Sequence, residues 1–256
     1  MVFVILPAYN EEDGISDLLT EISLTVDDFL PALKVCVVIV NDGSSDDTLS
    51  RAHHTIAELE NASLGKNLTF TVIDHQVNKG LAEAIKTGFL YCVDKANPRD
   101  VILTMDSDNS HTPGLIPSLV RQIYEGHDVA IASRYRPGAK VIGLSLYRKL
   151  LSLGASVIFQ LLFPISGVRD YTCGYRAYKA QVLKEVLRND EDFISESGFT
   201  AMVDILLKLR RYERELFMTE IPLLLRYDKK LSASKMNVNR TVKQTFNLIW
   251  RRVRGL

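Results

Sequence analysis

The 256-residue sequence predicts an α/β protein with a mostly parallel sheet flanked by helices. Short apolar runs recur along the first half of the chain, and segments with apolar residues at helical spacing separate them. Polar clusters follow three of these runs, at residues 7–11, 41–48 and 106–111. Parallel strands end at one edge of their sheet, so we expect these clusters to meet there and form a ligand-binding crevice.

The first part of the chain alternates between predicted strands and helices. The apolar run 2–6 predicts a buried strand, and apolar positions at helical spacing within 15–22 predict the helix that follows. The runs 35–40 and 68–73 predict two further strands, because they are rich in apolar and β-branched residues. A second helix is expected across residues 82–89.

The run 101–105 predicts the strand that matters most for function. It leads directly into Asp106-Ser-Asp108, and residues two apart on an extended chain point the same way. Two carboxylates in that arrangement repel each other, which a hard divalent cation such as Mg²⁺ or Mn²⁺ relieves. A solvated turn is the alternative. A helix near 114–125 and a strand at 128–133 are expected next, and residues 220–222 are expected to start a last strand.

The composition is that of an ordinary globular protein, with 46% apolar and 24% charged residues. Cys36, Cys92 and Cys173 lie far apart, so they give neither a disulfide framework nor the spacing of a metal site. No basic region precedes the first apolar run, so we expect a reducing, cytoplasmic location rather than secretion.

Charge is distributed unevenly, although the net charge is zero. Residues 1–130 carry 8 Lys and Arg against 20 Asp and Glu, whereas residues 208–256 carry 13 against 4. A basic end on an acidic body indicates that an anionic surface or ligand meets the C-terminal part. A solvated basic helix is the alternative, and we expect no nucleic-acid partner.

No G-x-G-x-x-G or Walker sequence is present, which argues against the common dinucleotide and ATP cradles. A nucleotide whose phosphates are held by a metal remains open.

Five short motifs occur in the order and spacing found in family 2 glycosyltransferases. They are Pro7-Ala-Tyr-Asn-Glu11, Asn41-Asp-Gly-Ser-Ser45, Asn78-Lys-Gly80 with Gly88-Phe89, Asp106-Ser-Asp108 and Cys173-Gly-Tyr-Arg176. Over residues 1–236 the chain most resembles the dolichyl/polyprenyl-phosphate mannose synthases. The resemblance implies a GT-A fold, a nucleotide-sugar donor and Mg²⁺ or Mn²⁺. It also implies a nucleotide-sugar-binding half, 1–133, and an acceptor-binding half, 134–236, ahead of a basic amphipathic helix at 237–256.

The same resemblance implies which residues bind the donor. They are Pro7, Tyr9, Glu11, Val40 and Asp42 at the nucleoside, Asp106, Asp108, Arg226 and Lys235 at the diphosphate, and Lys79 and Ser107 as further donor-binding residues. Asp106 and Asp108 are the implied metal ligands, Asp108 being the more direct one. Ser110 stands where the synthases usually have Gln, so we expect a weaker metal contact there, with water in place of the lost ligand.

The resemblance also implies that Arg134, Arg148 and Ser152 bind the phosphate of the acceptor lipid. Guanidinium groups match phosphate oxygens in bidentate geometry, which supports this role. Ordinary surface ion pairs are the alternative. Asp170 would orient a loop, cap the acceptor site, or serve as a base if the acceptor were a hydroxyl.

Two segments are candidates for contact with a membrane. Residues 150–168 contain no charge over nineteen positions, close to the ~20 needed to span a bilayer, but polar residues and a proline interrupt them. We therefore expect a helix in the membrane interface, with a buried core helix as the alternative. Residues 238–253 combine an apolar helical stripe with basic residues, which suits either an anionic membrane surface or packing within the protein. The stripe consists of Val238, Val242, Phe246, Ile249, Trp250 and Val253.

Together these observations predict a metal-dependent, inverting glycosyltransferase that moves a hexose from a nucleotide sugar onto a polyprenyl or dolichyl phosphate. Mannose from GDP-mannose is the expected donor, and peripheral attachment to the membrane is the expected location. One alternative is a transferase that uses a UDP-glucose-type donor and a sugar or protein hydroxyl. Another is a nucleotide-sugar-binding protein without catalysis. The oligomeric state is left open.

Overall fold

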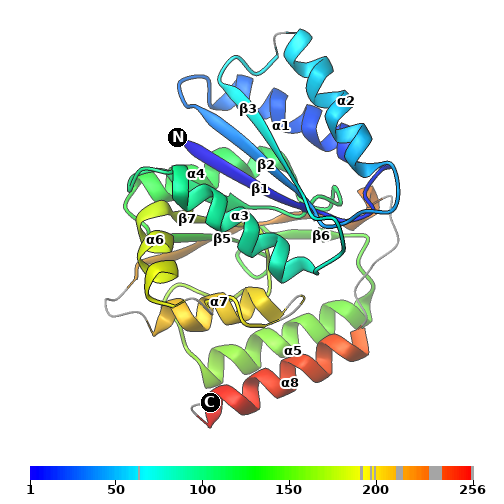
Figure 1. Cartoon of the computed structure of the whole chain (residues 1–256). Helices are drawn as coiled ribbons and strands as arrows, with labels where there is room; N and C mark the ends of the chain where they lie inside the picture. The colour runs from blue at the N-terminus through cyan, green and yellow to red at the C-terminus, as the bar shows by residue number, and fades with distance from the viewer. Residues whose placement is uncertain are drawn as a thin grey trace.

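A computed structural model describes residues 1–62, 64–190, 193–196, 198, 200–211, 216–230 and 238–254. Its centre is a seven-stranded sheet in the order β3-β2-β1-β4-β7-β5-β8 (Figure 1). The neighbouring strands are parallel except for β7, which runs antiparallel to both β4 and β5. The strands are β1 (Val2–Ala8), β2 (Val35–Asn41), β3 (Leu68–Asp74), β4 (Val101–Thr104), β5 (Val129–Ser133), β7 (Arg176–Lys179) and β8 (Met218–Pro222).

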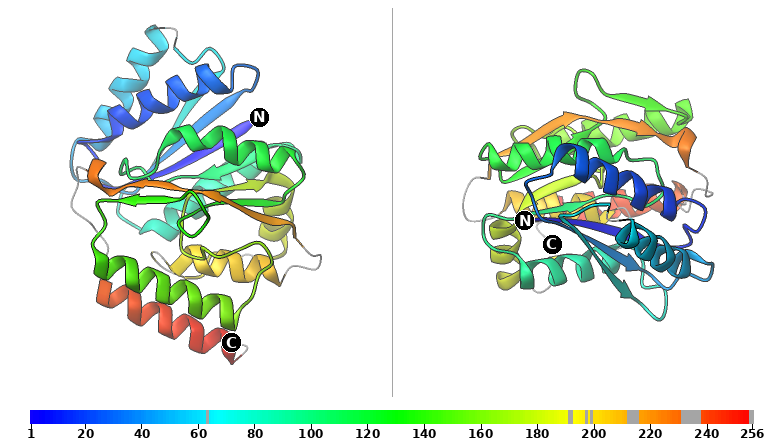
Figure 2. Two further views of the ribbon diagram at one scale, coloured as in Figure 1. Left: turned by 180° about the vertical axis from the view of Figure 1, so that it is seen from behind. Right: turned by 90° about the horizontal axis from the view of Figure 1, so that it is seen from above.

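Helices cover both faces of this sheet, as predicted for parallel strands that are apolar along their whole length. Helices α3 and α6 lie on one face, and α1 and α4 lie on the other (Figures 1 and 2). Every residue of β2, β4 and β5 is buried. The helices are α1 (Ile15–Phe29), α2 (Thr48–Asn61), α3 (Leu81–Lys95), α4 (Ile116–Tyr124), α5 (Leu146–Leu162), α6 (Ala180–Asn189), α7 (Thr200–Arg210) and α8 (Val238–Val253), with short 3₁₀ turns η1 (Pro113–Leu115) and η2 (Tyr227–Lys229).

Three strands were missed by the sequence reasoning. Strand β7 reads Arg-Ala-Tyr-Lys, so it has no apolar run, yet Arg176 is fully buried and donates to the carbonyl oxygens of Met202 and Tyr171 at 2.7 Å each. Strands β6 (Lys140–Ile142) and β9 (Leu224–Arg226) pair as a separate parallel sheet of three-residue strands. Such short strands leave no periodic pattern to read.

Helices α5 and α8 lie side by side, away from the seven-stranded sheet (Figures 1 and 2). They carry 11 of the 20 large apolar side chains that are exposed in the described part of the chain. We call this set the apolar surface: Leu146, Tyr147, Leu150, Leu153, Val157, Ile158, Leu161, Leu162, Phe246, Trp250 and Val253. The alternative of a buried core helix for residues 150–168 is therefore wrong.

The two helices differ in detail from the sequence expectation. Helix α5 begins before residue 150 and ends at Leu162, so the uncharged segment is only partly helical. Among the described residues, no helix combines the length and the hydropathy that crossing a bilayer requires. In α8 the fully buried side chain is Leu248, which lies outside the predicted stripe, and the side chain of Val238 lies outside the described part.

Candidate active site

The loop after β4 places Asp106 and Asp108 at the carboxyl edge of the sheet, as predicted. Lys230 Nζ lies 2.5 Å from Asp108 Oδ2. The backbone N–H and the hydroxyl of Ser110 donate to Asp108 Oδ1 at 3.0 and 2.6 Å. The Asp106 backbone N–H donates to His111 Nδ1, which places the proton of this ring on Nε2, 3.8 Å from Asp106 Oδ2.

The two carboxylates of this loop have different proton affinities. Burial and the neighbouring Asp108 both raise the pKa of Asp106, and they outweigh the lowering by His111. Burial alone would raise the pKa of Asp108 too, but Lys230 and the Ser110 hydrogen bond hold it below its ordinary value. Asp108 is therefore the more firmly ionised of the pair, which suits the more direct metal ligand.

The donor atoms of this loop fit a hard divalent cation that brings further ligands of its own. In the described part of the chain no three Asp, Glu, His or Cys side chains converge as a complete metal cage. Mg²⁺ is typically held by one or two carboxylates, completed by water and by substrate phosphates. Asp106, with 36% of its side chain exposed, and Asp108 match that pattern. The Ser110 hydroxyl is directed at Asp108 rather than into open space.

The motif Cys173–Arg176, from the second half of the chain, packs against the carboxylate loop. Strand β7 pairs with β4 and so brings Gly174 against Asp106, where a Cβ atom would lie 3.1 Å from Oδ1. Tyr175 stacks on His111 with ring centroids 5.0 Å apart. The Thr104 hydroxyl donates to the Gly174 carbonyl oxygen at 2.7 Å. These contacts explain why two motifs far apart in the sequence occur together.

On the predicted nucleoside side, Asp42 forms the centre of a buried network. Its carboxylate accepts the backbone N–H groups of Lys79 and Gly80, at 2.9 and 2.7 Å. His75 Nδ1 lies 2.8 Å from the same carboxylate, and His75 Nε2 lies 2.9 Å from the Thr87 hydroxyl. Asp42 thereby ties the end of β2 to the start of α3, which shapes the wall of the crevice.

The other predicted donor residues lie near this network but contribute in different ways. Ser107 is buried, and its hydroxyl donates to the Pro7 carbonyl oxygen at 2.5 Å, which joins the ends of β1 and β4. Glu11 is buried, whereas Tyr9 is half-buried. The Val40 side chain is fully buried, so it can act only by positioning its neighbours.

Arg134 and Asp170, both predicted at the acceptor, form a buried ion pair. Arg134 Nε and Nη2 lie 2.8 and 2.6 Å from the two carboxylate oxygens, and Nη2 also donates to the Thr172 hydroxyl. Burial would raise the pKa of Asp170, but Arg134 outweighs it and lowers that pKa. Burial would likewise lower the pKa of Arg134, and Asp170 reverses the shift. Asp170, fully buried and ionised, is placed to orient Arg134 rather than to touch a substrate.

A cavity of about 550 Å³ begins beside Asp106 and extends between α3, α5, α7 and α8. Arg134, Arg148 and Ser152 line it together with Asp106, so the predicted acceptor residues do come together. The Ser152 hydroxyl lies 2.7 Å from that of Tyr135. Most of the remaining wall is apolar: Leu81, Ile85, Leu144, Leu150, Leu151, Ala155, Ile158, Met202, Val203, Leu223, Leu225, Val242, Phe246 and Ile249.

Of the two other predicted phosphate contacts, one has a different partner and one cannot be placed. Arg226 is paired with Asp228, two residues further along, at 2.8 Å. Lys235 lies outside the described residues. Sequence reasoning missed Lys230 and His111, although His111 lies three residues after the carboxylate motif and Lys230 belongs to a basic pair shortly after Arg226.

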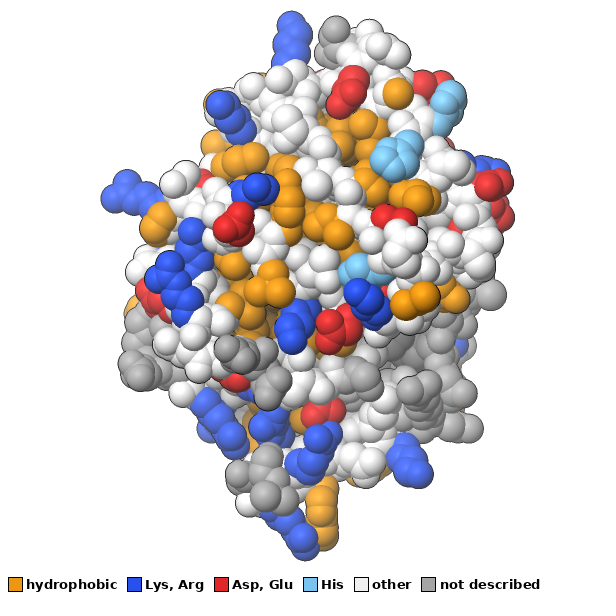
Figure 3. Space-filling model, in the orientation of Figure 1, with side chains coloured by type: hydrophobic (Ala, Val, Ile, Leu, Met, Phe, Trp, Pro, Cys, Tyr) orange, Lys and Arg blue, Asp and Glu red, His pale blue; other side chains and the backbone are white. Residues whose placement is uncertain are grey.

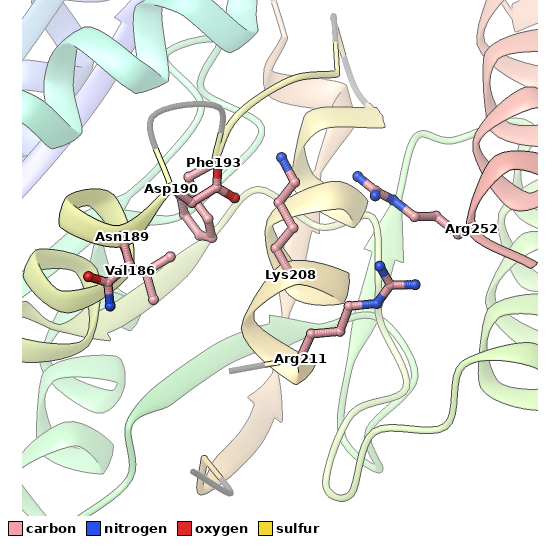
Figure 4. Close-up of a pocket in the computed structure, with 7 residues that line it drawn as sticks. All are labelled: Val186, Asn189, Asp190, Phe193, Lys208, Arg211 and Arg252. Carbon is pink, nitrogen blue, oxygen red and sulfur yellow. The ribbon is translucent and has the colours of Figure 1, made fainter. Parts of the chain in front are cut away.

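A second cavity, of about 280 Å³, lies between α6, α7 and α8 (Figure 4). Lys208 and Arg252 approach it from α7 and α8, and each forms an ion pair with the fully buried Asp204, at 3.2 and 2.5 Å. These pairs fasten α8 to α7. The cavity is thus a joint between helices, remote from the carboxylate loop.

Comparisons with known proteins agree with this architecture. The chain is 34% identical over 208 residues to a dolichol-phosphate mannosyltransferase of Pyrococcus furiosus, which covers 81% of this chain and 52% of that protein. It is 28% identical over 236 residues to an undecaprenyl-phosphate mannosyltransferase of Micrococcus luteus, covering 92% of this chain and 87% of that protein. The chain thus spans about half the length of the first relative and most of the second.

A solved structure of similar fold is glucosyl-3-phosphoglycerate synthase from Mycobacterium tuberculosis with Mn²⁺, UDP and phosphoglyceric acid. It superimposes with a TM-score of 0.65 at 17% identity and covers 100% of this chain and 79% of its own, which confirms the predicted GT-A fold. Residues 3–187 match the family model described as glycosyl transferase family 2. The chain therefore belongs to glycosyl transferase family 2, as its five motifs predicted.

Proposed function

We propose that the chain is a metal-dependent, inverting transferase that moves mannose from GDP-mannose onto a polyprenyl or dolichyl phosphate at a membrane surface. The observation that carries this proposal is the large cavity, because it joins the carboxylate loop to two arginines and to an apolar wall. A lipid phosphate would match this order, with its anionic phosphate at the arginines and its apolar chain along the apolar wall. The names of the two mannosyltransferase relatives support the same sugar and the same class of acceptor.

The polar end of the cavity suits a phosphate group. Arg148 lies on the first turn of α5, and Arg134 is held in place by Asp170 through Nε and Nη2. Guanidinium groups bind phosphate oxygens strongly, and a preoriented guanidinium loses less entropy on binding. The two arginines would thus place the acceptor oxygen next to the carboxylate loop.

The reaction needs no general base if the acceptor is a phosphate. An anionic phosphate oxygen attacks the anomeric carbon and forms the new C–O bond, while the bond to the nucleoside diphosphate breaks and its electron pair leaves with the diphosphate. Asp106 and Asp108 would hold the divalent cation, whose charge stabilises the departing diphosphate when bound. Lys230, beside Asp108, adds a positive charge at the same place.

A hydroxyl acceptor is less well supported, because it would require a carboxylate base near the anomeric carbon. Asp170 was the candidate, but it is fully buried and hydrogen-bonded to Arg134 and to the backbone N–H groups of Thr172 and Cys173. Its lowered pKa also makes it a weak base. A purely binding role has no positive support, since Asp42, Asp106 and Asp108 are all in place.

The apolar surface of α5 and α8 supports contact with a membrane. Tyr147 and Phe246 line the cavity and are also exposed, so the cavity opens through this surface. Lys and Arg side chains predominate at the lower end of the molecule, where α5 and α8 lie (Figure 3). An apolar face bordered by positive charge is typical of helices that lie in the interface of anionic membranes. The polyprenyl chain would then enter the cavity directly from the bilayer.

Transfer assays with each donor test the reaction. GDP-mannose and UDP-glucose are supplied in turn with Mn²⁺ and a short polyprenyl phosphate, and both the nucleoside diphosphate and the glycosylated lipid are measured. We expect lipid-dependent release of GDP with mannose recovered on the lipid. Turnover that is independent of the lipid would contradict the proposed acceptor, and binding without turnover would contradict catalysis.

The single tryptophan of the chain gives a direct test of membrane contact. Trp250 is 59% exposed on the apolar surface, so its fluorescence should shift to shorter wavelength when anionic vesicles are added. Neutral vesicles at the same lipid concentration should produce a smaller shift, because the basic residues contribute less there. An unchanged spectrum with both vesicle types would contradict contact through α8.

A further inference from the structure

The ion pair between Lys230 and Asp108 lies where the proposed metal would bind. Lys230 Nζ is 2.5 Å from Asp108 Oδ2, and only 12% and 13% of the two side chains are exposed. Asp108 Oδ1 accepts both the backbone N–H and the hydroxyl of Ser110. Both oxygens of this carboxylate therefore already have partners within the chain.

A metal ion and Lys230 would compete for the same oxygen. Mg²⁺ lies about 2.0–2.1 Å from a carboxylate oxygen, close to the distance at which Nζ already stands. Two cations that share one oxygen repel each other strongly in a partly buried site. Asp108 therefore binds either Lys230 or a divalent cation through Oδ2.

The segment that precedes Lys230 holds it in this position. The Arg226 backbone N–H donates to the Ser110 carbonyl oxygen at 2.8 Å, which fixes the end of β9 against the carboxylate loop. Lys230 then follows the short turn η2. Lys229, its neighbour, lies 3.8 Å from Glu21 and is half exposed, so it is a natural control with the same charge and a different position.

We propose that Lys230 is a built-in counter-cation that occupies Asp108 in the free enzyme and moves to the donor's diphosphate when a divalent cation binds. The inference rests on the proposed function and deepens it. A lysine suits such an exchange because it is a point charge on a flexible stem. The nucleoside diphosphate supplies the negative partner that Lys230 loses at Asp108, so metal and nucleotide bind cooperatively.

Mn²⁺ binding in the absence of acceptor tests this exchange. Free Mn²⁺ is measured by electron paramagnetic resonance, with and without GDP or UDP, for wild type, Lys230→Met, Lys230→Arg and Lys229→Met. We expect Lys230→Met to bind Mn²⁺ alone about tenfold more tightly than wild type, because its competitor is gone. It should also gain less Mn²⁺ affinity than wild type when nucleotide is added. Lys230→Arg keeps the competing charge, so it should not bind Mn²⁺ alone more tightly than wild type does. Lys229→Met should stay close to wild type.

Two controls keep the result interpretable. Asp108→Asn should lose the Mn²⁺ binding, which places the measured ion at this carboxylate. Mn²⁺ should also raise the melting temperature of Lys230→Met more than that of wild type, because a tighter ligand stabilises the folded state more. If the Met variant does not fold, Lys230→Gln replaces it, with the same expectation.

The possible failures can be distinguished. Equal Mn²⁺ affinity in wild type and Lys230→Met, with and without nucleotide, would overturn the exchange and leave the proposed transfer reaction intact. If no variant binds Mn²⁺ even with GDP or UDP present, the proposed metal dependence fails, and the exchange fails with it.

Discussion

Two ion pairs border the crevice, and they differ in how completely the carboxylate is engaged. Asp170 is fully buried and meets Arg134 through both oxygens, with further N–H donors from the backbone. Asp108 meets Lys230 through one oxygen only, and 13% of the Asp108 side chain is exposed, against none of Asp170. Arginine provides a rigid planar fork, whereas lysine provides a mobile point charge.

This difference separates a structural pair from an exchangeable one. Breaking the Arg134–Asp170 pair would leave the charge of the fully buried Asp170 uncompensated, which makes this pair permanent. Breaking the Lys230–Asp108 pair is tolerable if a divalent cation and a diphosphate replace the lost partners. A pair of a basic side chain and an aspartate can therefore serve two purposes. On the acceptor side it fixes Arg134, and on the donor side it leaves Asp108 available to a metal ion.

The largest expected effect comes from removing the exchangeable carboxylate. Asp108→Asn should lower the transfer rate by on the order of 10³-fold or more, because the cation that stabilises the leaving diphosphate loses its main ligand. Sugar recovered on the lipid measures this, and circular dichroism checks that the fold is intact. Near-wild-type turnover with Mn²⁺ would contradict the assignment of Asp108.

Breaking the structural pair should instead unfold the protein more easily. Asp170→Asn removes a fully buried carboxylate and leaves the largely buried Arg134 without its anion, so we expect the free energy of unfolding to fall by about 3–5 kcal/mol in urea denaturation. Asp228→Asn is the matched control, because Asp228 pairs with the more exposed Arg226 and should matter little. Similar losses in both variants would mean that burial does not distinguish the pairs.

Acid should remove the advantage that wild type has over Asp170→Asn. The pKa of Asp170 is lowered in the folded state, so its contribution is complete above its unfolded pKa, about 3.9, and is lost as pH falls through the folded value. The difference in unfolding free energy between the two proteins should therefore be constant near pH 7 and shrink below about pH 4. A difference that grows in acid would contradict the ionised state of Asp170.

A smaller effect is expected from the other arginine of the acceptor side. Arg148→Ala should lower kcat/KM for the polyprenyl phosphate by about 10–100-fold, the cost of one charge-assisted hydrogen bond to a phosphate, with little change in donor affinity. Lys149→Ala is the control, since Lys149 is exposed on the next position of α5. Equal losses for donor and acceptor would remove Arg148 from the acceptor site.

The sequence was sufficient for the parts of the fold that depend on local pattern. The run 35–40 predicted β2 because six apolar residues, mostly β-branched, suit a strand buried on both faces. Strand β7 was not predictable in this way, because Arg176 and Lys179 bound it and its antiparallel pairing depends on distant strands. Its buried arginine donates to carbonyl oxygens from elsewhere in the chain.

The site residues also divide into those that local sequence pattern predicts and those that depend on the path of the chain. Asp106 and Asp108 could be placed because a strand directly precedes them and fixes their direction. The lysine beside them could not be predicted, because Lys229 and Lys230 look alike in sequence and only the path of the chain after β9 brings Lys230 to Asp108. Arg226 was chosen from the resemblance, yet the structure pairs it with Asp228.

Ser110 gives the smallest effect and sharpens the comparison between the two pairs. Its hydroxyl donates to Asp108 Oδ1 at 2.6 Å, so it orients the exchangeable carboxylate, while its backbone N–H holds the same oxygen independently of the side chain. Ser110→Ala should therefore lower the transfer rate by less than about tenfold, the value of one ordinary hydrogen bond. A direct metal ligand would instead lose nearly as much as Asp108→Asn, so the ratio of the two rates, measured at saturating Mn²⁺, distinguishes a residue that positions Asp108 from one that binds the ion.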